Sequence, residues 1–255
     1  MTTTEEQIQT GVEEHVETGI EEHVQPVTEV KKKLLTEDLG KMFEMAICLT
    51  FNIPYDGKYK YGMELPEQLK QRLAQLVELF PMCSHTAKKG ARYDYTSIDG
   101  TTHLSAKTNK KGKKIGRVAP QVIGQAQPQK FCDILGIELT TIPDLKEFIQ
   151  ANINVILPVL TEHTFDCPNL YFNQNNNTIQ YIVLSSQIEW ETYQFKWTND
   201  WKKTGSSTLK IVIGCVETAL VEFQFHSGGR SNMAIRWFYD NFINVFKNNL
   251  TITNL

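Results

Sequence analysis

The sequence predicts an α/β (α+β) domain, and three features of its apolar pattern lead to this prediction. Apolar residues recur every three or four positions over residues 36–47 and 66–79, which is the spacing of helices that bury one face. Near residue 91 the period changes to the alternation of two strands joined by a tight turn. The last third of the chain alternates apolar and polar residues in short runs, which indicates further strands. Helices, a hairpin, more helices and then strands are typical of a mixed fold.

The first 33 residues are predicted to form a disordered acidic arm ahead of one globular domain at residues 34–255. The arm carries an eight-residue duplication, since residues 10–17 recur almost unchanged as residues 18–25. Two copies are too few for a stacked repeat architecture. Residues 1–30 contain eight acidic residues and no lysine or arginine, so 21 acidic residues face 26 basic ones in the rest of the chain. A mildly basic domain is compatible with a polyanionic partner.

Turn residues and helix-start signals divide the domain into elements. Thr36 begins a capping pattern, and Pro66 suits the first turn of a helix. The first half is expected to contain, in order, a helix from residue 36, a turn at 54–57, a helix over 66–79, strands over 91–98 and 103–108 joined by a turn at 99–100, and a basic loop over 109–117. The second half is expected to contain a helix over 120–135 kinked at Pro128, a helix over 143–160, a loop at 173–177, strands over 179–185, 191–197, 209–213 and 219–226, and a strand-to-helix element over 235–246.

The cysteine and hydropathy patterns exclude several classes of protein. The five cysteines are odd in number, widely scattered and lack a C-x-x-C pair, so neither a disulfide framework nor a zinc site is indicated. We therefore expect a reducing, cytoplasmic location. The acidic N-terminus does not look like a signal peptide, and no apolar run approaches the roughly 18 residues that a membrane span needs.

The predicted hairpin gathers groups suited to phosphodiester hydrolysis. Side chains two residues apart on a strand share a face, so Ser105 and Lys107 point the same way and Asp94 on the facing strand can approach them. Hydrolysis of a phosphodiester needs a hard oxygen ligand for Mg²⁺, together with a cation that positions water or neutralises developing charge. A carboxylate, a hydroxyl and an ammonium in one cluster meet part of this need.

These residues resemble the PD-(D/E)XK nuclease superfamily, and type II restriction endonucleases in particular. That family carries an Asp on one strand and [D/E]-x-K on the next, which Asp94 and Ser105-Ala106-Lys107 match in spacing. Tyr93 replaces the proline, and Ser105 replaces the second carboxylate. The resemblance implies a mixed central sheet flanked by helices, Mg²⁺-dependent cleavage of double-stranded DNA that leaves 5′-phosphate ends, and a homodimer where the DNA site is palindromic.

The missing carboxylate has a candidate on the first predicted helix. The resemblance implies that Glu44 joins Asp94 as a metal ligand, because such nucleases often supply a helical glutamate upstream of the hairpin; the alternative is a solvated glutamate. Asp99 is assigned to the turn. Gln121 and Gln125 follow on the expected helix and could orient water or contact a phosphate, or could simply pack.

Two further segments are expected to contact DNA. The run after the hairpin is rich in bases, which adjacent to a metal site favours phosphate contact over plain solvation; its members are Lys110, Lys111, Lys113, Lys114 and Arg117. Residues 221–236 resemble the C-terminal segment of some restriction endonucleases, where a strand delivers polar groups to base edges; those expected to do so are Gln224, His226, Arg230, Asn232 and Arg236. A core strand with one polar face is the plain alternative, and Glu222-x-Gln224 also leaves room for a rival active site.

The sequence thus predicts a site-specific double-stranded DNA endonuclease. Two alternatives act on the same partner: a sequence-specific DNA-binding protein that keeps a nuclease-like fold without cleavage, which Ser105 favours, and a metal-independent enzyme such as a glycosylase. An interaction protein without affinity for nucleic acid is the third. Salt-dependent DNA binding, a requirement for Mg²⁺ and the chemistry of the product separate these classes.

Overall fold

The computed structural model describes residues 35–88, 91–112, 115–138, 141–201, 205–226 and 232–255. The expected acidic arm at residues 1–33 lies outside the described residues, as do Lys113, Lys114 and Arg230. Within the described ranges, no helix combines the length and the apolar character needed to cross a bilayer.

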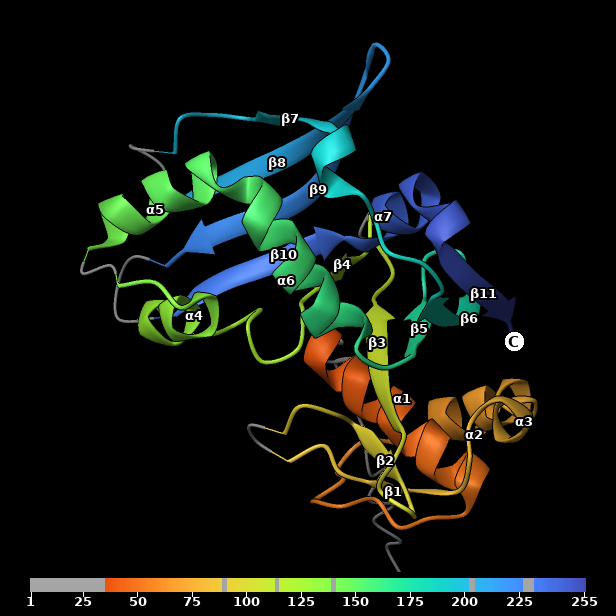
Figure 1. The fold of residues 1–255 in the computed structure, drawn as a ribbon. Coiled ribbons are helices and arrows are strands. Elements are labelled where there is room, and N and C mark those ends of the chain that lie inside the picture. Colours follow the sequence, from red (N-terminus) through yellow and green to blue (C-terminus); the bar gives the residue numbers. More distant parts are fainter. Residues whose placement is uncertain (1–34, 89–90, 113–114, 139–140, 202–204, 227–231) are drawn as a thin grey trace, which may run out of the picture. The chain divides into compact units, whose positions relative to one another are not determined.

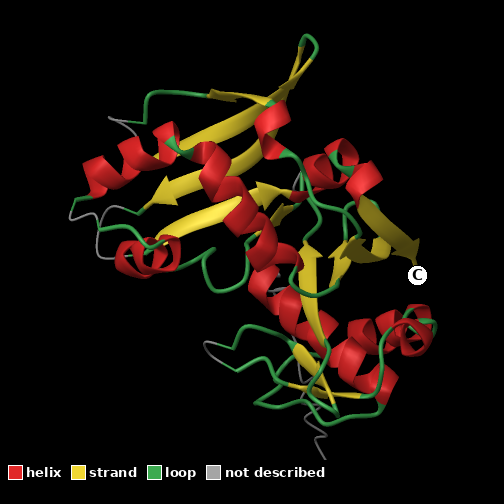
Figure 2. Ribbon diagram, viewed as in Figure 1, coloured by secondary structure: helices red, strands yellow, loops and turns green. Residues whose placement is uncertain are grey.

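The strands of the described residues form two sheets (Figures 1 and 2). The first is a mixed six-stranded sheet in the order β1 (Cys83–His85), β2 (Tyr95–Ser97), β3 (His103–Asn109), β5 (Asn169–Asn173), β6 (Thr178–Leu184) and β11 (Leu250–Asn254). The second is an antiparallel five-stranded sheet in the order β4 (Arg117–Val118), β10 (Met233–Phe238), β9 (Val216–Phe225), β8 (Ser206–Ile213) and β7 (Gln194–Trp197). The mixed α/β class and a mixed sheet are confirmed, whereas the second, antiparallel sheet was not predicted.

Along the chain, the described helices alternate with groups of strands. They are α1 (Thr36–Phe51), α2 (Glu64–Arg72), α3 (Leu76–Leu79), α4 (Pro128–Leu135), α5 (Ile142–Ala151), α6 (Ile153–Phe165) and α7 (Tyr239–Val245), with short 3-10 turns at Trp190–Thr192 and Lys247–Asn249. Helix α1 begins where the Asp38 carboxylate accepts a hydrogen bond from the Leu35 N–H at 2.8 Å, and it ends at Asn52 in the left-handed conformation.

Strand β3 runs through the middle of the first sheet and packs against α1. It pairs with β2 in antiparallel fashion and with β5 in parallel fashion, and its residues point alternately to two faces. On one face, Leu104 and Ala106 pack with the apolar side of α1. The other face carries Ser105, Lys107 and Asn109. One strand therefore supports a packed core on one side and a row of polar side chains on the other.

The five-stranded sheet has a similar division of faces. Apolar side chains of β8, β9 and β10 form one core with α5 and α6, which lie across the sheet in Figure 1. On the opposite face polar residues lie in register, with Glu222 of β9 between Thr208 of β8 and Arg236 of β10. Trp237 of β10 belongs to the apolar face, and its indole N–H donates to the Thr164 hydroxyl of α6 at 2.8 Å.

Asp240 at the start of α7 ties the two sheets together. Its carboxylate accepts hydrogen bonds from the Gly116 N–H at 2.7 Å, from the Tyr171 hydroxyl at 3.0 Å and from the Asn173 amide at 3.0 Å. Gly116 precedes β4, whereas Tyr171 and Asn173 belong to β5. A Cβ atom at position 116 would lie within 1.9 Å of the Tyr171 hydroxyl, so only glycine permits this approach.

Asp240→Ala is expected to destabilise the protein by about 3 kcal/mol, which corresponds to a fall in Tm of roughly 10 °C. The reason is that three donors would lose a charged acceptor inside the structure. Thermal unfolding followed by circular dichroism measures the effect. Asp133→Ala is the matched control, because among the described residues the Asp133 carboxylate accepts from Gln129 alone, on the exposed surface of α4. Equal Tm values for the two variants would contradict the role given to Asp240.

Several predicted elements have different bounds in the structure. The strand expected over 91–98 begins only at Tyr95, so Asp94 precedes it. The helix expected over 120–135 forms only from Pro128, because residues 121–125 are turns, and the helix expected over 143–160 is divided at Asn152 into α5 and α6. The strand expected over 191–197 begins at Gln194. The helix expected over 66–79 is divided into α2 and α3. Helix α1, strands β3, β6, β8 and β9, and the strand-to-helix element over 235–246 are confirmed.

Candidate active site

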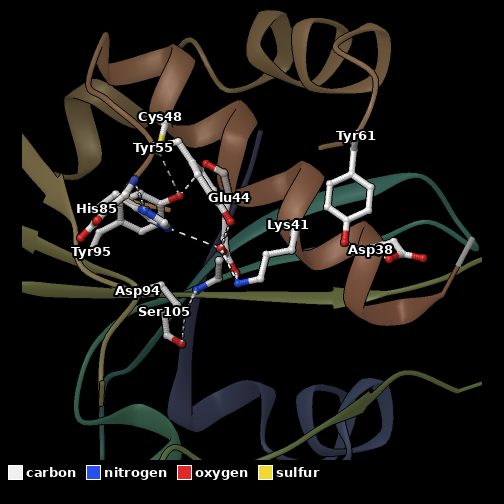
Figure 3. Close-up of polar contacts among 12 residues, drawn as sticks. Asp38, Lys41, Glu44, Cys48, Tyr55, Tyr61, His85, Asp94, Tyr95 and Ser105 are labelled. Carbon is white, nitrogen blue, oxygen red and sulfur yellow. Dashed lines mark hydrogen bonds and ion pairs between the residues drawn. The ribbon is translucent and has the colours of Figure 1, made fainter. Parts of the chain in front are cut away.

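Asp94 lies at the fork where β2 separates from β3. Its N–H still donates to the Leu104 carbonyl at 3.2 Å, but its side chain then takes the place of the departing strand. Carboxylate Oδ2 accepts hydrogen bonds from the Ala106 N–H at 2.7 Å and from the Ser105 hydroxyl at 3.0 Å (Figure 3). Within the described residues, Oδ1 accepts no hydrogen bond. Asp94 is thus fixed by one oxygen, and the other is available to a ligand.

Lys107 lies two residues beyond Ser105 on the same face of β3, and its side chain is partly buried. Among the described residues, its ammonium makes no hydrogen bond and no ion pair within 4.0 Å. Burial lowers the pKa of Lys107 below its usual value, and the negative charges around it, Asp94 foremost, partly offset this effect. A partly buried ammonium without a fixed partner is costly for the fold. Its donors are open to another molecule.

The electrostatics of Asp94 reflect the same cluster. Burial raises the pKa of the Asp94 carboxyl, the ammonium of Lys107 lowers it, and the charge of Glu44 raises it again. Asp94 is therefore influenced by the charges of one cation, Lys107, and one anion, Glu44. Two carboxylates that repel one another would be stabilised by a shared cation.

Glu44 is held on α1 by three side chains, which Figure 3 shows around its carboxylate. Lys41 donates to Oε2 at 3.1 Å, the Tyr55 hydroxyl donates to the same oxygen at 3.1 Å, and His85 Nε2 lies 3.4 Å from it. Although burial opposes ionisation, the His85 and Lys41 contacts keep the pKa of Glu44 below its usual value. Glu44 is thus not the solvated glutamate of the alternative interpretation. It approaches from the α1 side of β3, whereas Ser105 and Lys107 lie on the opposite face.

Sequence reasoning missed His85 and its neighbours. His85 on β1 is 5% exposed, its Nδ1 accepts from the Asp56 N–H at 2.9 Å, and its ring stacks on Tyr55 with centroids 4.4 Å apart. Because Nδ1 accepts, Nε2 carries the hydrogen and faces Glu44. A three-residue strand with a single histidine gave no periodic signal from which this contact could be predicted.

Asp166 anchors the segment that leads into Asp94, and it was also missed. It caps the C-terminus of α6 and accepts from Arg92 Nε at 2.6 Å and from the Tyr93 hydroxyl at 2.9 Å. The Tyr93 ring in turn stacks on His103 of β3 at 3.9 Å. Tyr93, which stands at the proline position of the motif that the sequence resembles, therefore positions the segment by side-chain contacts.

Gln121 reaches the site from a turn rather than from the expected helix. Its amide donates to the Ser105 hydroxyl, and its backbone N–H donates to the His163 carbonyl of α6 at 2.7 Å. Val122 follows with φ of 61°, a strained value for a β-branched residue, and strain of this kind clusters at functional sites. A Cβ atom on Gly124 would lie 2.5 Å from the Pro120 carbonyl oxygen, so the turn needs glycine there.

The predicted DNA-binding residues divide into two groups. Arg117, Gln224 and Arg236 lie together, because Arg117 and Arg236 both pair with Glu222 and Arg236 also donates to Gln224 at 3.5 Å. Gln125 lines the same hollow as the two arginines. The remaining described members stand apart in the chain, with Lys110 and Lys111 directly after β3, His226 directly after β9 and Asn232 directly before β10.

The donor set fits Mg²⁺ in type but is small. Mg²⁺ takes oxygen ligands, often one or two carboxylates completed by water and substrate phosphate. The unengaged Oδ1 of Asp94 and the charge of Glu44 acting on Asp94 supply this chemistry. Across the described ranges, however, no group of three or more His, Cys, Asp and Glu side chains is placed to hold a metal ion. Ser105, which stands at the second carboxylate position of the motif that the sequence resembles, accounts for the shortfall.

Comparison with known proteins gives an independent result. Over 225 residues the chain is 40% identical to the type II restriction enzyme CviAII of Paramecium bursaria Chlorella virus 1. The match covers 87% of this chain and 64% of the viral enzyme, so the chain spans a little under two thirds of that protein's length. No family model matches the chain, and no solved structure matches it. By sequence, the chain is a homologue of a type II restriction enzyme.

Proposed function

We propose that this chain is a site-specific endonuclease that hydrolyses phosphodiester bonds of double-stranded DNA with Mg²⁺. The observation that carries the proposal is the fork of β2 and β3, where a fixed carboxylate lies beside a lysine that has no partner among the described residues. The similarity to a type II restriction enzyme supports the choice of DNA as substrate. The fold is accordingly proposed to be a variant of the PD-(D/E)XK nuclease fold.

Asp94 and Glu44 are the residues that would hold Mg²⁺. When bound, the ion would supply Lewis-acid polarisation of the scissile phosphate and would favour ionisation of water. The protein's own contribution begins with Asp94, whose Oδ2 is fixed by Ser105 and Ala106 so that Oδ1 keeps one orientation. His85, Tyr55 and Lys41 perform the same positioning for Glu44.

Lys107 would act directly on the reacting groups. Its ammonium has three donors and no competing partner among the described residues, so it can hold the attacking water or a non-bridging phosphate oxygen. The developing negative charge on the phosphate is stabilised because the ammonium is partly buried and its field is little screened by solvent. Gln121, held against the Ser105 hydroxyl, positions that hydroxyl and, through it, Asp94.

The substrate is proposed to bind along the polar face of β3 and the neighbouring basic residues. Lys110 and Lys111 follow the catalytic strand, and the backbone of Lys111 is fixed by a 3.0 Å hydrogen bond to the Gln174 side chain. Such lysines contact phosphates and carry no sequence information. A homodimer is proposed for palindromic sites, because two-fold symmetric DNA is cut on both strands by two copies related by the same symmetry.

The test is digestion of plasmid and phage DNA by the purified full-length chain, with Mg²⁺ and with EDTA. We expect discrete fragments only in the presence of Mg²⁺, with ends that DNA ligase rejoins without prior phosphorylation. Breaks that appear only after alkali treatment and persist in EDTA would instead indicate a glycosylase. Fragments of continuous size distribution would contradict site specificity.

A non-cleaving, sequence-specific DNA-binding protein is the second candidate. One observation favours it: the Ser105 hydroxyl occupies the position of a second carboxylate and donates to Asp94, leaving the donor set small. Retention of a specific duplex on a native gel, with intact DNA at every Mg²⁺ concentration, would establish this function in place of cleavage.

A further inference from the structure

A hollow of about 630 Å³ opens at the end of β3, beyond the candidate active site. Asn109 lines it from β3 itself, Arg117 from β4, Arg236 from β10 and Gln125 from the turn that follows β4. Glu37 of α1 completes the polar lining. Residues from both sheets therefore meet here, and most of them carry planar amide or guanidinium groups.

The two arginines are fixed from behind by one carboxylate. Glu222 Oε2 accepts from Arg117 Nη1 at 3.1 Å and from Arg236 Nη1 at 3.3 Å. Arg117 also lies over the Phe238 ring, 4.9 Å from its centroid. Each guanidinium uses only its Nη1 atom in these contacts. In the part of the chain that the structure describes, the Nε and Nη2 donors of both arginines are left without a hydrogen-bond partner.

The free donors fit a pair of acceptors on either a base or a phosphate, and the charge balance of the hollow favours the base. The paired Nε and Nη2 donors form a planar fork that matches the O6 and N7 acceptors of guanine. The charges favour a base, because Glu222 and Glu37 balance Arg117 and Arg236 and leave the hollow close to neutral. A phosphate site would gain from uncompensated positive charge, as Lys110 and Lys111 provide nearby.

We propose that this hollow is the base-recognition pocket of the chain, in which Arg117 and Arg236 read guanine edges in the major groove and Glu222 holds them in position. The inference rests on the proposed function, since it assumes that DNA lies along β3. It goes beyond that function by assigning base discrimination to two arginines and their positioning to Glu222. Gln125, which is exposed at the rim, is suited to an adjacent adenine.

The test is selection of duplexes with a randomised central segment, carried out in EDTA so that no DNA is cut. The variants are Arg117→Lys and Arg236→Lys, which keep the positive charge but lose the planar fork. We expect each to lower the preference for guanine at one position by roughly ten- to a hundredfold, with little change in affinity for unselected DNA. Arg72→Lys is the matched control, because the hydrogen bonds of Arg72 on α2 to described residues go to Asn177, away from the hollow.

Glu222→Gln supplies a second, independent variant. With the balancing charge removed, we expect tighter binding to unselected DNA, a steeper salt dependence and weaker discrimination between sequences. Circular dichroism verifies that each variant is folded. Uniform weakening on every sequence, or unchanged base preferences in both arginine variants, would overturn the pocket while leaving the endonuclease function standing. A wild-type chain that selects no sequence would instead overturn the proposed function itself.

Discussion

Lys107→Met is expected to reduce DNA cleavage by about a thousandfold while the protein stays folded. The charge of the Lys107 ammonium lowers the pKa of Asp94, and the ammonium has no hydrogen-bond partner among the described residues. Methionine has a similar length without the charge, and burial already opposes that charge, as the lowered pKa indicates. We therefore expect the free energy of unfolding to stay constant or to rise by up to about 1 kcal/mol.

Single-turnover cleavage rates and thermal unfolding, measured on the same preparation, separate the two effects. Lys110→Ala is the matched control, since Lys110 lies just beyond the same strand and is proposed to contact a phosphate away from the reacting one. A lower Tm in Lys107→Met together with full cleavage would show that the lysine serves the fold. The affinity measured by gel retention in EDTA should be unchanged. Lys107 is proposed to act at the one reacting phosphate, whereas binding depends on contacts along the whole duplex.

Asp94→Asn should also lower the cleavage rate by about a thousandfold, for a different reason. The asparagine oxygen can still accept from Ser105 and from the Ala106 N–H, so the fork keeps its geometry. The negative charge that would bind Mg²⁺ is lost. We expect cleavage to recover partly at high Mg²⁺ concentration, because the remaining carboxylate binds the ion more weakly.

Rates measured across a Mg²⁺ titration test this expectation. Asp99→Asn is the control, because Asp99 belongs to the exposed turn after β2, where it accepts from Ser97 and Thr101. A wild-type rate and an unchanged Mg²⁺ dependence in Asp94→Asn would move the reaction centre away from the β2–β3 fork. The same titration on Lys107→Met should leave the Mg²⁺ requirement as it is in the wild-type chain.

The sequence predicted local structure where one face of an element is apolar. Helix α1 and strand β9 were predicted because their apolar residues recur at the period of a helix or a strand. Strands β5 and β11 were not, since β5 is buried along its whole length and β11 is a short C-terminal segment. The division into two sheets depends on contacts between distant residues, such as those of Asp240, and these leave no local pattern.

The site shows the same limit. The proximity of Asp94, Ser105 and Lys107 could be predicted, because a hairpin brings together in space residues that are near one another in the sequence. Gln121 was predicted to serve the site but on the wrong element, because the strained turn at Val122 cannot be inferred from apolar periodicity. His85 and Asp166 contact the site residues from distant parts of the chain, and only tertiary packing reveals them.

Asn109 lies two residues after Lys107 on the same face of β3. In the proposed function, this spacing would fix the distance between the cleaved bond and the recognised base. Two residues of an extended strand span about 7 Å, and stacked base pairs of DNA rise by about 3.4 Å each. A duplex that places its scissile phosphate at Lys107 would therefore present a base only about two steps away to the pocket at the end of the strand. Cleavage would fall inside the recognised sequence, at an offset fixed by the rigid strand.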